Sequence, residues 1–197
     1  MGKSKKRTVS TIVTMVVVAI IVLLLYFYLA FRMDLQKETS VEELSEVEKL
    51  LDKDLELNYP ETPREVIKLH SNMMKTLYTE LEDEEVEALA LKIRELYDTE
   101  FLETKSEGDY LKDLYSEIAE WKDSDRKISY FHLVNEELEQ ESIIDGRKLA
   151  AVYVSYTIQE KDKFLETWRF LLRQSEEDEK WKILGWEFVP EEEEVKE

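Results

Sequence analysis

The stretch IIDGRKLAAVYVSYTIQ, residues 143–159, decides the fold. Asp145-Gly146 supplies the positive φ angles of a tight hairpin turn, so it predicts two antiparallel strands over residues 138–144 and 148–159. In the second strand, large apolar residues recur at every other position, which places them on one face of a sheet. These residues are Val152, Val154, Tyr156 and Ile158.

The regions on both sides of this hairpin complete the fold prediction. Alternating patterns predict further strands over residues 128–134, 164–173 and 181–189. Before Lys127, apolar residues recur every three to four positions and predict three helices. The first begins at Pro63, the second has an apolar face from Val86 to Phe101, and the third opens near Asp109. We therefore expect an α+β domain, with three helices packed on a curved antiparallel sheet of four to five strands.

An apolar segment near the N-terminus has the length of a membrane span. From Ile12 to Phe31 there are 20 residues, and Thr14 is the only one that is neither apolar nor aromatic. A helix of this length crosses the hydrocarbon core, whereas a cleaved signal peptide has a shorter apolar core and a small-residue cleavage site. We therefore expect residues 11–32 to be a retained single-pass anchor in the cell membrane. Because basic residues precede the segment, residues 1–10 would be cytoplasmic and the C-terminal domain extracellular.

The part of the chain after this segment is strongly acidic. The whole chain has a formal charge of −19, and residues 1–33 hold five basic and no acidic side chains, so the remainder carries −24. This excludes nucleic acid as a partner, since phosphate binding requires basic patches. We expect residues 33–61 to form a stalk or a lead helix, residues 62–189 a folded domain, and residues 190–197 a disordered acidic tail.

Three segments carry a resemblance to known families: NYPETPREVIKLHSNMMKTLY at residues 58–78, RKLAAVYVSYTI at 147–158 and KWKILGWEFV at 180–189. Over about residues 45–189 the chain resembles an uncharacterised family of membrane-anchored proteins from clostridial Firmicutes. The order of its elements also resembles the nuclear-transport-factor-2-like (SnoaL-like) fold. That resemblance implies a cone over residues 62–189, in which a bent sheet wraps the helices and leaves a pocket at its open end. The resemblance to the uncharacterised family brings no catalytic residues with it.

The candidate pocket residues are His70, Met74, Tyr97, Tyr153, Glu166 and Trp168. Glu166 shares a strand face with Trp168, so it is either a buried general base or a rim carboxylate that faces water. His70 lies on the apolar stripe of the first helix, as either a core or a pocket residue. Two histidines without cysteine predict no metal site, and the absence of a glycine-rich loop predicts no nucleotide cofactor.

Two hypotheses about function remain open. In the first, the domain is a non-catalytic interaction or scaffold module, tethered at the outer membrane surface and bound to a protein partner. An exposed apolar patch on the outer face of the sheet would favour it. In the second, the cone binds a small ligand or performs acid–base catalysis, which needs an open cavity with convergent polar groups. The anchor favours the first hypothesis.

Overall fold

The computed structural model describes residues 44–134 and 140–190. The chain divides into two units, Met1–Leu44 and Ser45–Glu197, and the fold described below belongs to the second. The predicted anchor at residues 11–32, the first part of the predicted stalk and residues 191–197 of the predicted tail lie outside the described residues. Within the two described ranges, no helix has both the length and the apolar character needed to cross a bilayer.

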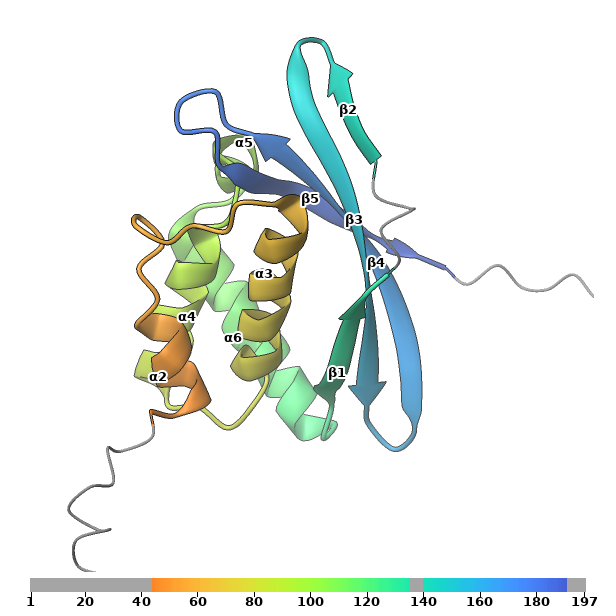
Figure 1. Cartoon of the computed structure of the whole chain (residues 1–197). Helices are drawn as coiled ribbons and strands as arrows, with labels where there is room; N and C mark the ends of the chain where they lie inside the picture. Colours follow the sequence, from red (N-terminus) through yellow and green to blue (C-terminus); the bar gives the residue numbers. More distant parts are fainter. Residues whose placement is uncertain (1–43, 135–139, 191–197) are drawn as a thin grey trace, which may run out of the picture. The chain divides into compact units, whose positions relative to one another are not determined.

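Five antiparallel strands form one sheet (Figure 1). They are β1 (Lys127–Leu133), β2 (Gln140–Ile144), β3 (Arg147–Gln159), β4 (Lys163–Gln174) and β5 (Trp181–Val189). The long strand β3 pairs with β1, β2 and β4, and β4 pairs with β5. In the turn between β2 and β3, Asp145 has a φ of 51° and Gly146 a φ of 80°. The hairpin predicted from these two residues is thereby confirmed.

Three longer helices pack beside this sheet (Figure 1). They are α3 (Pro63–Leu77), α4 (Asp83–Arg94) and α6 (Glu107–Asp123), and the short helices α2 (Glu46–Leu51) and α5 (Thr99–Leu102) accompany them. The start of α3 follows from local chemistry: Pro63 takes the first helical position, and the side chain of Thr62 accepts a hydrogen bond from the backbone N–H of Glu65 at 3.2 Å. The predicted α+β fold class is confirmed.

The two faces of the sheet differ as the alternation predicts. The inner face, defined here by the buried residues Val152, Val154, Tyr156 and Ile158 of β3, packs against the helices. Tyr156 is paired across the sheet with Glu166 and Val154 with Trp168, so both of these β4 side chains also lie on the inner face. Tyr153 lies on the opposite, outer face, since successive side chains along a strand alternate.

The second helix ends earlier than its apolar pattern suggests. We expected its apolar face to continue to Phe101, but α4 ends at Arg94. Beyond it, the backbone of Leu96 and Asp98 forms two hydrogen bonds of 2.8 Å with that of Ile183 in β5. The chain thus leaves the helix to extend the sheet edge, and Asp98 then caps α5 by accepting from the N–H of Glu100 at 2.9 Å.

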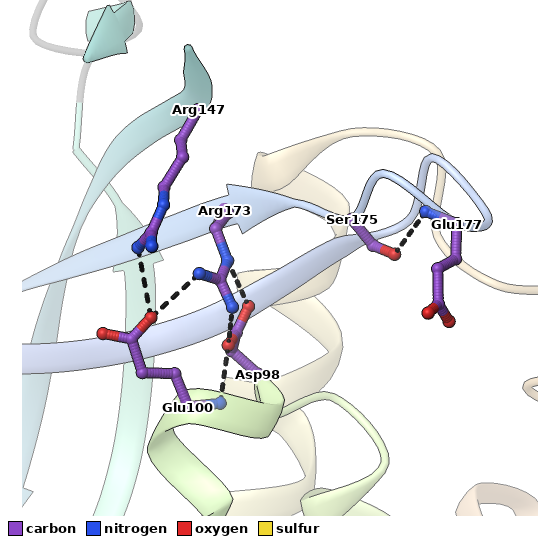
Figure 2. A network of polar contacts seen from close by, with 6 residues as sticks. All are labelled: Asp98, Glu100, Arg147, Arg173, Ser175 and Glu177. Atoms are coloured by element: carbon purple, nitrogen blue, oxygen red, sulfur yellow. Dashed lines mark hydrogen bonds and ion pairs between the residues drawn. The ribbon is translucent and has the colours of Figure 1, made fainter. Parts of the chain in front are cut away.

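An ion-pair network holds α5 against the sheet (Figure 2). Arg173 of β4 forms a bidentate pair with the buried carboxylate of Asp98, in which its Nε donates to Oδ2 at 2.9 Å. Arg173 also donates to Oε2 of Glu100 at 2.9 Å, and Arg147 of β3 donates to the same oxygen at 3.2 Å. Because Asp98 is paired and hydrogen-bonded, the free-energy cost of burying its charge is offset. The same bonds hold the segment that carries Tyr97 in place.

Candidate functional site

A cavity of about 180 Å³ lies between helices α3 and α6 and the inner face of the sheet. An aliphatic cavity of about 150 Å³ is large enough to hold benzene, so this one has room for a single ring with a short substituent. Its wall is rich in aromatic rings, which come from α6, from the end of α3 and from three strands. These rings belong to Tyr78, Trp121, Tyr156, Trp168, Phe170 and Trp186.

His70 is the most deeply buried polar residue of this wall, with 3% of its surface exposed. Its Nε2 lies 3.3 Å from the hydroxyl of Tyr97, while its Nδ1 is buried without a hydrogen-bond partner among the described residues. Burial lowers the pKa of the imidazole to about 3, so the ring is neutral at physiological pH. One buried hydrogen-bonding atom of His70 therefore has no partner within the described part of the chain.

Glu166 is held by two neighbours. Its Oε1 accepts from Nη2 of Arg126 at 2.9 Å, and its Oε2 accepts from the indole N–H of Trp168 at 3.3 Å. The side chain is 21% exposed, so it is neither fully buried nor a rim group directed into water. The guanidinium of Arg126 also lies over the ring of Trp121, 4.5 Å from its centroid. Both oxygens of Glu166 are thus already hydrogen-bonded within the protein.

A second carboxylate reaches the cavity from α6. Oε1 of Glu117 accepts a hydrogen bond from the hydroxyl of Tyr78 at 2.7 Å. Burial, followed by the nearby charge of Glu117, raises the pKa of Tyr78 well above its ordinary value, so this phenol stays protonated and acts as a donor. The ring of Tyr78 stacks on that of Trp121 with centroids 3.9 Å apart. Glu117 forms no ion pair with any residue that the structure describes.

Four of the six predicted pocket residues meet in this cavity: His70, Met74, Glu166 and Trp168. Tyr97 adjoins it through His70 and lines a neighbouring hollow of about 220 Å³. The two hollows share Glu117 and Trp186 as lining residues. Tyr153 was predicted to line the pocket, but the register of β3 places it on the outer face of the sheet, away from the cavity.

Sequence reasoning did not select Glu117 or Trp186, which line the cavity, or Arg126, which pairs with Glu166 beside it. No signal in the sequence indicated Glu117 or Arg126. No group of three or more His, Asp or Glu side chains within residues 44–134 and 140–190 is placed to hold a metal ion. The wall instead offers aromatic faces, one neutral imidazole and two carboxylates.

Comparison with known proteins gives one result at the level of the family. No curated protein matches the chain. One family does, and its match extends over residues 1–186, which includes the cavity and nearly the whole described sheet. The expectation of an uncharacterised family is confirmed by this match. The chain belongs to the family described as domain of unknown function DUF6715.

Proposed function

We propose that the folded domain binds a small organic molecule in the cavity between α3, α6 and the inner sheet face, without catalysing a reaction. The observation that carries this proposal is the cavity itself, whose aromatic wall also includes His70, Glu117 and Glu166. Pockets with apolar walls and a few polar groups are the usual sites for small ligands.

The same arrangement gives less support to acid–base catalysis. Glu166 was the candidate general base, but both of its oxygens accept hydrogen bonds, from Arg126 and from Trp168. A general base must lie within hydrogen-bond reach of the proton that it removes, and these two bonds hold the carboxylate toward Arg126 and Trp168 instead. His70 is neutral and could accept a proton, but burial without a neighbouring carboxylate opposes the cation that would form. Binding is therefore the function to test first.

The finer fold and the location belong to this proposal as well. We propose the nuclear-transport-factor-2-like cone, supported by the register shifts at Ile128/Tyr130 and Leu171/Leu172, which bend strands where they occur. We also propose that residues 11–32 anchor the chain in the cell membrane, with residues 1–10 cytoplasmic and the domain outside. The length of the apolar segment and the basic residues before it support this.

The binding proposal is tested with the full-length chain in detergent micelles and with one-ring probes at millimolar concentration, followed by ligand-observed NMR. Benzyl alcohol, benzylamine and benzoate share one size and differ in charge, and a Kd on the order of 1 mM or tighter is expected for at least one. The variant Met74→Trp fills the cavity from α3 and should abolish the signal. If no probe binds, or if Met74→Trp binds as wild type does, the proposal is wrong.

A second candidate function, interaction with a protein partner, has its own supporting observation. The outer face of the sheet exposes apolar side chains at Tyr130, Leu165 and Leu171, which are 61%, 53% and 38% exposed. Tyr130 and Leu165 flank the same residue, Thr157, from the two neighbouring strands. Exposed apolar side chains that lie together on one face are typical of interaction surfaces.

This second candidate is tested in cells with a photo-crosslinking residue at Leu165 and a matched control at Glu84, an exposed position on α4. A docking surface on the outer face predicts a discrete protein adduct from Leu165 that is missing from Glu84. Equal adduct patterns from the two positions would contradict it.

A further inference from the structure

The chemistry of the cavity wall is specific enough to name a class of ligand. We infer that the cavity takes a small cationic molecule, an ammonium group carried on an aromatic or aliphatic body. This inference rests on the proposed function, since it presumes that the cavity binds a small ligand. Two features of the wall carry it: the sign of its charges and its aromatic faces.

The charges that line the cavity are negative. Glu117 and Glu166 are its charged lining residues, and no Lys or Arg is found among the described residues that line it. Arg126 compensates Glu166 from beside the cavity, but among the described residues Glu117 accepts only from the neutral hydroxyl of Tyr78. A bound carboxylate or phosphate would meet an uncompensated like charge, whereas a bound ammonium would meet an opposite one.

The aromatic rings of the wall also favour a cationic ligand. A ring presents negative potential above its face, and a cation within about 6 Å of the centroid is attracted to it. Arg126 demonstrates this at the edge of the cavity, because its guanidinium lies 4.5 Å from the centroid of Trp121 and 5.6 Å from that of Phe164 while it pairs with Glu166. The wall therefore already combines aromatic rings and a carboxylate around one positive charge.

His70 adds no positive charge to the wall. Burial lowers the pKa of its imidazole to about 3, so the ring is neutral and does not repel a bound cation. The cavity volume of about 180 Å³ limits the body of the ligand to about one ring.

The test compares benzylamine, benzyl alcohol and benzoate at pH 7.5 on the full-length chain, by titration calorimetry and ligand-observed NMR. These probes have closely similar shapes and carry positive, zero and negative charge. We expect benzylamine to bind about tenfold more tightly than benzyl alcohol, and benzoate to bind weakest. Added salt should weaken benzylamine binding and leave benzyl alcohol unchanged.

Variants separate this inference from the proposed function. Glu117→Gln should lower the affinity for benzylamine severalfold and leave that for benzyl alcohol unchanged, while Glu120→Gln, an exposed change on the same helix outside the lining, should alter neither. If benzyl alcohol or benzoate binds as tightly as benzylamine, the cationic class is wrong and the binding cavity stands. If none of the three probes binds, the proposed function itself fails.

Discussion

Replacing His70 with glutamine should remove a large part of the acid sensitivity of the fold. Burial holds the pKa of His70 at about 3, compared with an ordinary value of 6.5. As the pH falls below 6.5, the unfolded chain takes up a proton that the folded chain refuses until about pH 3. The contribution of His70 to the free energy of unfolding is therefore fully present above pH 6.5 and is lost progressively as the pH falls from 6.5 to 3.

The size of the effect follows from the difference between the two pKa values. A pH of 5 is 1.5 units below the ordinary pKa of 6.5, and each unit corresponds to about 1.4 kcal/mol. Protonation of His70 in the unfolded chain therefore lowers the free energy of unfolding at pH 5 by about 2 kcal/mol relative to pH 7.5. Glutamine keeps a side chain that can hydrogen-bond but does not titrate. Wild type should thus lose about 2 kcal/mol more than His70→Gln between these two pH values.

The assay is urea unfolding of the full-length chain in detergent micelles at pH 7.5, 6 and 5. Tryptophan fluorescence is a suitable signal because all four tryptophans lie in the described domain. The many carboxylates contribute equally to both proteins and cancel in the comparison. His132→Gln is the matched control, because this second histidine has an exposed side chain and its loss should leave the wild-type pH dependence in place.

Equal pH dependence in wild type and His70→Gln would refute the reasoning. So would an imidazole NMR signal of His70 that titrates near pH 6.5 in the folded protein. Either result would mean that the ring is open to water and that the cavity wall is not as described.

Two further predictions use the same unfolding assay at pH 7.5. Asp98→Asn should destabilise the fold by about 3 kcal/mol, because it leaves the guanidinium of Arg173 without its buried ionic partner. The control Arg169→Gln removes an exposed ion pair and should change stability by less than about 0.5 kcal/mol. Similar losses of stability in both variants would contradict the argument. Gly146→Ala should cost about 1 kcal/mol, since its φ of 80° is strained for any residue with a Cβ. Gly108→Ala, in α6 with open space around the new methyl, should be neutral or stabilising by up to about 1 kcal/mol, and a loss as large as that at Gly146 would show that the turn conformation is not the cause.

Local signals in the sequence were sufficient for most elements of the fold. The last strand was predicted over residues 181–189 and is found at Trp181–Val189. The hairpin at Asp145-Gly146 and the helix that begins at Pro63 were also predicted, because turn residues, capping residues and hydrophobic period act over a few neighbouring positions. Such signals do not depend on which distant segment packs against them.

The end of the second helix shows where local reasoning fails. The apolar positions from Val86 to Phe101 fit one helical face, yet the chain leaves the helix after Arg94. What decides this is a pair of backbone hydrogen bonds to Ile183, a residue far along the sequence, and the ion pair of Asp98 with Arg173. Neither partner can be identified from the helical pattern itself, because both become neighbours only after the sheet has formed.

The candidate site was likewise predictable from the sequence only in part. The amino-acid sequence by itself determined the α+β class, the inner face of β3 and β4, and hence that Glu166 and Trp168 point to the same side as the helices. Only the tertiary structure decided that Arg126 neutralises Glu166, that Glu117 reaches the cavity from α6, and that Tyr153 faces away from it. The physical reason is that a cavity is the space left between packed layers, so its shape and its polar groups depend on long-range contacts rather than on the order of residues along any one element.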